Sequence, residues 1–424
     1  MRLALGDLPA LCSPTGALVH RHGDSGVTQR HEGRLAEGPA PELVESAYRW
    51  EVELAPYLWS GMNWADLAHT VMLIEKGLAP REKGTRLLTL VLELAALPLQ
   101  SFPLDPALGD LYTNREHWLA GRDPEAAGWL GLGRARREAT TIAYHLAVRS
   151  RLLALAQALC RFLRALTDQA AQHRTTLMPD YTYLQPAQPT TLAHYLLCFA
   201  YPALRDVDRL RAAFHRVNRS PAGGGSTNGS RLPLDRERLA ELLGFEGLLP
   251  HPRDAMWQAD GPVEVVGAVV AVLLNLDRLA EDLQVWATHE FDFVELADAH
   301  ARGSVIMPQK KNPYALAFVR GLTGDLIVRL TAVAAAGKTP SGQVDNRLFP
   351  YHEVPRALDL AIRATELMAG VLRGARFNTA EMARRAHASH LYATDLAELI
   401  TQETGIDYRT AHAIVGRAVR LLGE

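Results

Sequence analysis

The sequence predicts an all-α protein organised around a central bundle of long helices. Residues 139–173 contain no glycine or proline, which predicts a helical rod of roughly 50 Å at ~1.5 Å per residue. A second rod is predicted for residues 261–288, where a heptad seam runs through Val265, Val269, Val272, Leu276, Leu279, Leu283 and Trp286. Hardly any segment alternates apolar and polar residues as a strand does. Rods of this length need partners along their sides, so we expect a multi-helix bundle formed by several subunits.

Composition places the chain among ordinary soluble proteins. Its 424 residues are 48% hydrophobic and 22% charged. Lys plus Arg number 45 and Asp plus Glu number 47, so the net charge is -2 and no basic field favours nucleic acid. The cysteines, Cys12, Cys160 and Cys198, are too few and too scattered for a disulfide framework or a zinc site. We therefore expect a cytoplasmic protein without a metal site.

Neither a membrane span nor a signal peptide is predicted. The most apolar stretch, residues 263–276, contains Glu264 and Asn275 and is too short to span a bilayer, which predicts a buried helix. Near the start, Asp7 and Pro9 interrupt the apolar run of residues 3–11. Residues 1 to about 40 predict an extended arm, and the pattern from residue 41 to residue 97 becomes helical.

Chemically reactive groups gather in residues 303–313, which read Gly-Ser-Val-Ile-Met-Pro-Gln-Lys-Lys-Asn-Pro. The glycine and the two prolines prevent a continuous helix, so Ser304 is expected on a loop that leads through Lys310 and Asn312 into the next helix. Loops carry a large share of catalytic residues. The alternative is an ordinary Gly/Pro turn with solvated lysines.

This segment closely resembles the signature of the fumarase/aspartase superfamily, and its Gln-Lys-Lys-Asn-Pro ending resembles the argininosuccinate lyase branch. The resemblance implies a three-domain fold with a central long-helix bundle, in a homotetramer whose active sites are shared between subunits. It implies that Ser304 is the general base on a mobile loop, and that Lys310 and Asn312 hold the negative charge of the substrate. Met307 belongs to the expected substrate-binding set. Where the family has a second serine, this chain has Val305.

The physical chemistry of the segment agrees with those roles. Removing a proton from a carbon beside a carboxylate builds up a dianion, so the site needs a base together with fixed positive charge and hydrogen-bond donors. A serine hydroxyl is a poor base unless a nearby cation and backbone N–H groups stabilise its deprotonated form. No cofactor is expected, because the carboxylate itself acts as the electron sink.

Two upstream segments resemble substrate-binding segments of the family. Residues 109–119 match it at several positions, and Asn114 is expected either to bind substrate or to cap a helix. Residues 131–141 retain Arg136, which we expect to bind a carboxylate through its two-pronged guanidinium group. Arg137 and Glu138 replace the Asn and Asp of relatives. Arg137 either brings a new cation to the site or pairs with Glu138 on a helix surface.

Residues 178–194 resemble a further family motif, in which Thr182 and Gln185 match substrate-binding positions. The family histidine is replaced by Tyr183, and the glutamate that partners that histidine is replaced by Ala317. Both members of a charge pair are therefore absent. A tyrosine hydroxyl can donate a proton but is slow to recover it. Tyr183 is expected to donate to the leaving group, to hold substrate, or to form only an aromatic wall.

A glycine-rich segment, residues 218–230, stands where the family has a different loop. Ser226, Thr227 and Asn228 on this segment are expected to bind the dicarboxylate substrate together with backbone amides. A phosphate-binding loop is the rival interpretation. No Gly-Lys-Ser/Thr sequence follows and no strand pattern precedes the segment, which argues against that alternative.

The resemblance extends from about residue 41 to residue 423 and implies a domain division at residues 1–108, 109–357 and 358–424. His69 matches a family histidine, and we expect it to be a packed or hydrogen-bonded structural residue rather than an acid or a base. Residues 337–353 depart from the segment that contacts the amino-acid part of argininosuccinate in relatives. This departure indicates a different leaving group.

The most favoured function is thus a carbon–nitrogen lyase that removes an amine or a guanidino group from an N-substituted aspartate and releases fumarate. An authentic argininosuccinate lyase is the second hypothesis. A catalytically silent structural or binding homologue is the third, because the helical bundle holds the scaffold together independently of the site.

Overall fold

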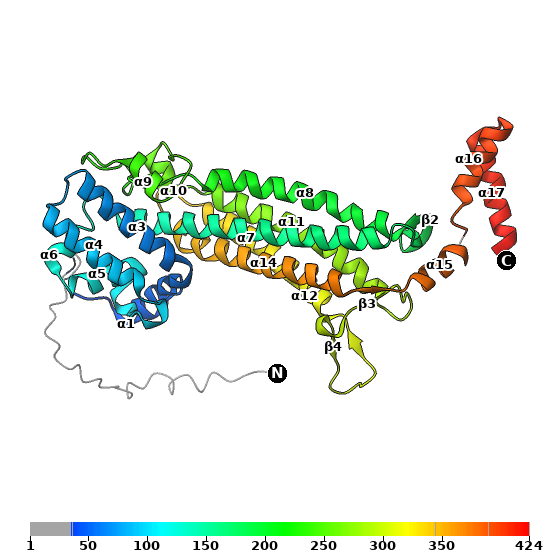
Figure 1. Cartoon of the computed structure of the whole chain (residues 1–424), viewed down its shortest axis with the longest axis horizontal. Coiled ribbons are helices and arrows are strands. Elements are labelled where there is room, and N and C mark those ends of the chain that lie inside the picture. Colours follow the sequence, from blue (N-terminus) through cyan, green and yellow to red (C-terminus); the bar gives the residue numbers. More distant parts are fainter. Residues whose placement is uncertain (1–34, 36, 344, 389, 424) are drawn as a thin grey trace, which may run out of the picture.

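A computed structural model describes residues 35, 37–343, 345–388 and 390–423, and the predicted all-α fold is confirmed. The molecule is elongated: a bundle of long helices lies between a cluster of short N-terminal helices and a small C-terminal helical unit (Figure 1). Apart from residues 35 and 37–40, the arm expected for residues 1–40 lies outside the described residues.

The N-terminal cluster is built from two longer helices and several short ones. Its elements are α1 Pro41–Leu43, the π-helical turn η1 Val44–Tyr48, α2 Arg49–Val52, α3 Ala55–Glu75, α4 Arg81–Ala96, the 3₁₀ turns η2 Leu99–Ser101 and η3 Pro106–Leu108, α5 Leu111–Ala120 and α6 Pro124–Ala127. Helix α3 packs against both α4 and the first long helix of the bundle, which joins the cluster to the bundle.

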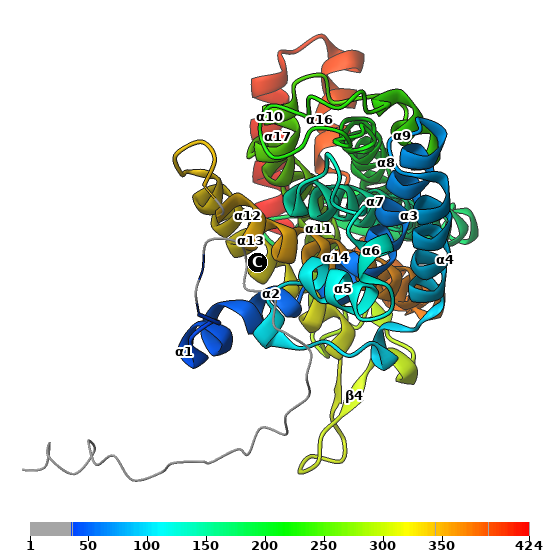
Figure 2. The ribbon, with the colours of Figure 1, turned by 90° about the vertical axis from the view of Figure 1, so that its left-hand side faces the viewer.

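Five long helices form the bundle. They are α7 Arg136–Gln172, α8 Leu192–Val217, α11 Asp260–Trp286, α12 Tyr314–Gly337 and α14 Pro350–Gly374. Helix α7 packs against α14, α8 and α3, whereas α11 packs against α12, α8 and α14. Figure 2 shows these helices end on. Buried side chains of all five helices belong to one hydrophobic core. The expected domain division at residue 358 falls inside α14, which continues along the bundle on both sides of that point.

Short helices and short strands, of two to seven residues, connect the rods. They are β1 Leu177–Thr182, β2 Gln185–Thr191, α9 Arg236–Leu242, α10 Pro252–Trp257, β3 Val294–Glu295, the 3₁₀ turn η4 Asp298–His300, β4 Arg302–Gly303, β5 Lys311–Asn312, α13 Asp345–Leu348 and β6 Arg376–Phe377. The strands pair antiparallel as β1 with β2, β3 with β6 and β4 with β5. The C-terminal unit follows as α15 Thr379–Ala388, α16 Ala393–Thr404 and α17 Tyr408–Gly423.

The heptad seam predicted for the second rod is confirmed, because all seven of its residues are buried in α11. Off the seam, Val266, Val270 and Leu273 are buried as well. Leu274 differs: it is 44% exposed in the single chain. It belongs to a set of exposed apolar side chains on three bundle helices, namely Leu197, Tyr201 and Leu204 on α8, Leu274 on α11, and Phe318, Ile327 and Val328 on α12.

A buried charge network positions the start of α7. Asp66 on α3 accepts hydrogen bonds from Arg115 on α5 and from Arg134, which lies two residues before α7. All three side chains are almost fully buried. Among the residues that the structure describes, no helix is both long and apolar enough to cross a bilayer.

Candidate active site

Ser304 lies on the hairpin loop between β4 and β5, as the glycine and prolines predict. Figure 1 shows this hairpin projecting from the side of the bundle. The Ser304 hydroxyl oxygen accepts hydrogen bonds from the backbone N–H groups of Ile306, at 3.3 Å, and Met307, at 3.0 Å. N–H donors of this kind favour the deprotonated form of an oxygen acid. The surrounding loop is open, with Val305, Ile306 and Met307 exposed.

The amide and ammonium groups of this hairpin have different environments. The Asn312 side chain donates to the carbonyl of Arg302 at 2.9 Å, which closes the hairpin across β4 and β5. Lys311 forms ion pairs with Glu295 at 2.7 Å and Asp298 at 2.6 Å, which fixes the base of the hairpin to β3 and η4. Lys310 is exposed and lies next to this anchored position. The loop tip is therefore held at its base and open at its end.

A second hairpin carries Thr182, Tyr183 and Gln185, all of which are exposed at the turn between β1 and β2. Tyr183 is 99% exposed and has a backbone φ of 55°, and Leu184 follows with a φ of 57°. Two successive non-glycine residues in the left-handed region are strained, and strain of this kind clusters at functional sites. The hairpin comes directly after the C-terminal end of α7.

Arg136 and Asn114 lie at the opposite end of α7. Arg136 is the first residue of that helix; its side chain is half exposed, and its Nε is 3.7 Å from Asp110 Oδ2. Asn114 is buried in α5, where its Oδ1 accepts from the Asp105 amide at 2.8 Å and its Nδ2 donates to the carbonyls of Asp105, Gly109 and Asp110. Asp110, and not Asn114, caps α5. In this structure the Asn114 carboxamide organises the preceding loop.

The glycine-rich segment lies at the same end as Arg136. Ser226 and Asn228 are exposed and Thr227 is partly buried. The segment is attached to α7 by Glu138, which is 1% exposed and accepts from the amides of Gly223 at 2.7 Å and Gly225 at 2.6 Å. The suggestion that Arg137 pairs with Glu138 on a helix surface is therefore wrong, because Glu138 is buried against the glycine-rich segment.

His69, which lies in the N-terminal helical cluster, has an uncharged imidazole ring. The histidine is buried, and its Nε2 lies 3.0 Å from the Leu132 carbonyl oxygen. Burial and the positive charge of Arg134 lower the pKa of His69 to about 3. A histidine with such a low pKa is uncharged near pH 7, which fits the structural role expected for it.

The predicted site residues thus fall into two groups at opposite ends of the helical bundle. Helix α7 has 37 residues, which places Arg136 about 55 Å from the β1–β2 hairpin at ~1.5 Å per residue. Helix α11 begins beside the glycine-rich segment and carries the chain away for 27 residues before the Ser304 hairpin. The β3–β6 pairing and the Lys311 ion pairs then hold that hairpin near the far ends of α11 and α14. One chain does not bring Ser304 and Tyr183 together with Arg136.

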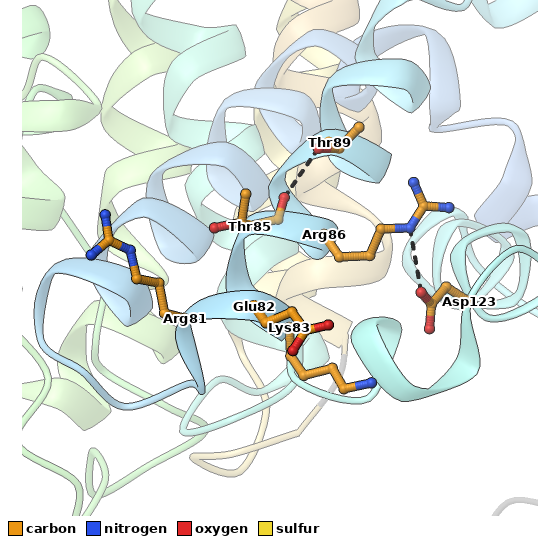
Figure 3. Close-up of a pocket in the computed structure, with 7 residues that line it drawn as sticks. All are labelled: Arg81, Glu82, Lys83, Thr85, Arg86, Thr89 and Asp123. Carbon is orange, nitrogen blue, oxygen red and sulfur yellow. Dashed lines mark hydrogen bonds and ion pairs between the residues drawn. The ribbon is translucent and has the colours of Figure 1, made fainter.

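Neither a metal-binding cluster nor a groove on α4 involves the predicted site residues in the described part of the chain. No group of three or more His, Cys, Asp or Glu side chains there is arranged to hold a metal ion. A surface groove of about 780 Å³ runs along α4, lined by Arg81, Lys83, Arg86 and neighbours (Figure 3). Two of its cations are neutralised, Lys83 by Glu125 and Arg86 by Asp123 at 3.3 Å. The groove contains none of the predicted site residues.

Comparison with known proteins agrees with the fold and the loop motif. The sequence matches the family described as Lyase over residues 94–327 and the family described as Argininosuccinate lyase C-terminal over residues 390–424. It is 32% identical over 391 residues to the argininosuccinate lyase of Methanothermobacter thermautotrophicus, covering 91% of this chain and 82% of that protein. It is 35% identical over 398 residues to that of Methanocorpusculum labreanum, covering 93% and 80%.

Comparison with a solved structure supports the same fold and family. An EDDS lyase variant with bound fumarate superposes with a TM-score of 0.80 at 30% sequence identity, covering 91% of this chain and 77% of that one. The helical bundle and the hairpin motif define a lyase of fumarase/aspartase type. Within that class, the chain belongs to the argininosuccinate lyase family and is an argininosuccinate lyase-like carbon–nitrogen lyase.

Proposed function

We propose that this lyase removes an amine or a guanidino group from an N-substituted aspartate, such as an argininosuccinate-like compound, and releases fumarate. Two relatives named argininosuccinate lyase and a structural neighbour with bound fumarate support this proposal. The observation that carries it is the Ser304 hydroxyl, which sits on an open hairpin loop and accepts two backbone N–H groups. Such an oxygen is prepared to exist as an alkoxide when substrate covers the loop.

The reaction begins at the carbon beside a carboxylate. Ser304 takes the Cβ proton, and the electron pair is held on that carboxylate as an aci-carboxylate stabilised by Lys310 and Asn312. The pair then forms the double bond of fumarate as the bond between Cα and nitrogen breaks. Tyr183, or a water molecule, gives the departing nitrogen its proton.

Binding residues surround this chemistry. Arg136 and Thr182 hold the succinyl carboxylates, since a guanidinium group binds a carboxylate with two parallel hydrogen bonds. The remaining contacts come from Asn114, Gln185, Met307 and the Ser226–Asn228 segment. The Asn114 side chain donates to carbonyl groups of the loop before α5. To bind substrate, it must give up some of these hydrogen bonds.

Such a site needs more than one copy of the chain, and we place it in a cytoplasmic homotetramer. The two groups of site residues lie at opposite ends of long helices, so copies packed in opposite directions bring the ends together. The exposed apolar side chains of α8, α11 and α12 supply a face for that packing.

The leaving group differs from arginine in this proposal. Tyr183, Arg137, the glycine-rich segment and residues 337–353 all depart from the pattern of relatives, whereas the Ser304 hairpin is retained. A retained base with altered surroundings favours elimination from a succinyl group that carries a different nitrogen substituent.

Fumarate formation by the purified protein tests the proposal. Argininosuccinate, adenylosuccinate, aspartate and other N-substituted aspartates are each offered to the wild type, to Ser304→Ala, and to Ser101→Ala as a surface serine control. We expect fumarate from at least one compound, a loss of ~10²-fold or more in kcat for Ser304→Ala, and an unchanged control. Size-exclusion chromatography checks that assembly is intact in each variant.

The outcomes separate the competing functions. Arginine and fumarate as the best products would identify an authentic argininosuccinate lyase. Turnover that survives in Ser304→Ala would reject the proposed base. No product from any succinyl compound would favour a silent homologue.

A further inference from the structure

The carboxylate of Glu138 has unusual hydrogen-bond partners for an acidic residue at the start of a helix. It is the third residue of α7, and the helix has no side-chain cap at Ala135. A glutamate at this position commonly turns back to the N-cap amide of its own helix. Here the carboxylate instead accepts one amide on each oxygen from the glycine-rich segment, Gly223 at 2.7 Å and Gly225 at 2.6 Å.

The glycine-rich segment is shaped to present those two amides. Gly223 and Gly225 have φ values of 73° and 62°, which side-chain-bearing residues rarely adopt. A Cβ atom at Gly223 would lie 2.6 Å from the Arg236 side chain, and one at Gly225 would lie 2.9 Å from the Gly229 carbonyl. The backbone therefore approaches its neighbours too closely for any other residue, and its amides converge on Glu138.

Arg137 holds the same segment from its other side. Its guanidinium group donates to the Met256 carbonyl at 2.9 and 2.6 Å and lies 3.4 Å from the centre of the Trp257 ring. The Trp257 indole N–H in turn donates to the Ser226 carbonyl at 2.9 Å. Two adjacent residues of α7 thus reach both halves of the segment, Glu138 directly and Arg137 through Trp257.

We propose that Arg137 and Glu138 form a clamp that sets the position of Ser226, Thr227 and Asn228, and that the clamp selects the leaving group of the substrate. Both are positioning residues that act through the segment and do not touch substrate. This inference rests on the proposed function. It connects two differences from the family motif, Arg137 and Glu138 in place of Asn and Asp, with the glycine-rich segment that stands in place of the family's loop.

The protonation of Glu138 gives the clamp a measurable signature. Burial raises the pKa of Glu138 to about 7, against the opposing effects of the Gly223 amide, of Arg134 before α7, and of Arg236 on α9. Protonation places a hydrogen on one of the two carboxylate oxygens and makes that oxygen a weaker acceptor, so the hydrogen bond from one of the two loop amides is weakened. The clamp is complete above pH 7 and weakened below it.

The first experiment compares Glu138→Gln with Glu138→Asp and with Glu93→Gln, an exposed glutamate control on α4. Hydrogen exchange of the residue 222–229 amides is followed by mass spectrometry in the assembled protein. We expect about tenfold faster exchange in Glu138→Gln, partial protection in Glu138→Asp and no change in the control. Unchanged exchange in Glu138→Gln would overturn the clamp, whether or not the protein has lyase activity.

Kinetics test the consequence for substrate selection. With the best substrate from the fumarate assay, Glu138→Gln is expected to raise KM about tenfold while kcat changes less than about twofold. The KM of the wild type is expected to rise as the pH falls through 7, and that of Glu138→Gln to be independent of pH over this range. Equal losses in kcat and in kcat/KM would contradict a positioning role.

A second variant guards against loss of folding when a buried charge is replaced. Trp257→Phe keeps the ring beside Arg137 but removes the N–H that binds Ser226, and Trp64→Phe on α3 is its exposed control. We expect Trp257→Phe to raise KM severalfold, and the double variant with Glu138→Gln to lose less than the product of the single effects. Strictly multiplicative effects would show that the two contacts act independently and would reject a single clamp.

Discussion

Arg115 binds Asp66 through two hydrogen bonds to one carboxylate oxygen, Oδ2, at 2.9 Å from Nε and 2.6 Å from Nη2. The other oxygen, Oδ1, receives Arg134 at 2.7 Å. Burial opposes ionisation of Asp66, but the two guanidinium groups outweigh it and lower the pKa of the carboxyl group. The network connects α3, α5 and the residues that lead into α7, so it holds the N-terminal helices on the bundle.

Replacing Asp66 tests the strength of this connection. Asp66→Asn leaves two buried arginines without a counter-charge, and we expect it to lower the free energy of unfolding by about 3–5 kcal/mol. Denaturant unfolding measures this change. The exposed pair Glu45–Arg49 supplies the control, since Glu45→Gln should leave stability unaltered within error. A small effect of Asp66→Asn would mean that the network is dispensable.

His69 predicts a specific dependence of stability on pH. The pKa of about 3 in the folded protein lies below the ordinary value of 6.5, so the unfolded chain binds the proton more tightly. Stability is therefore lost as the pH falls from 6.5 towards 3, by about 1.4 kcal/mol for each pH unit. The difference between wild type and His69→Gln isolates this contribution. Parallel stability curves for the two proteins would contradict it.

Removal of one oxygen atom tests the role of Tyr183. Tyr183→Phe keeps the aromatic ring and deletes only the O–H, so a proton donor would lose about 10²- to 10⁴-fold in kcat with little change in KM. We expect this loss, and Tyr48→Phe in the N-terminal cluster serves as the control. An unchanged kcat would reduce Tyr183 to an aromatic wall and would assign the proton to water.

The separation of Arg136 from the Ser304 hairpin predicts complementation between subunits. Arg136→Ala and Ser304→Ala are each expected to be inactive, but co-expression in equal amounts should restore about a quarter of the wild-type activity. That fraction follows because each shared site needs two intact residues from different copies, each present in about half of the chains. Mixed assemblies without activity would place the whole site in one chain.

Sequence reasoning predicted the scaffold well because its signals are local. The absence of glycine and proline before residue 173 and the heptad seam after residue 264 predict α7 and α11, whose bounds agree to within about three residues. The loop position of Ser304 followed in the same way from its flanking glycine and prolines. Such patterns depend on neighbours along the chain, and they need no knowledge of distant contacts.

Long-range contacts were not visible in those patterns. Glu138 looked like a helix-surface acid, yet it is buried because its partners are amides 85 and 87 residues further along the chain. Trp257 carried no signal at all, and its role depends on Arg137 and Ser226 meeting it in space. The three glycines at residues 223–225 are the one signal in the sequence, since such a run permits a close backbone approach without identifying the neighbour.

The sequence by itself determined the class of fold, the lengths of the rods and the chemical groups available, because backbone restriction and apolar periodicity act within a few turns. Tertiary structure alone decided which of those groups meet. Packing carries α7 along the whole bundle, so it separates Arg136 from the β1–β2 hairpin. Glu138 is buried against two amides of the glycine-rich segment, where no water can compete for their hydrogen bonds. This contact attaches the segment to α7.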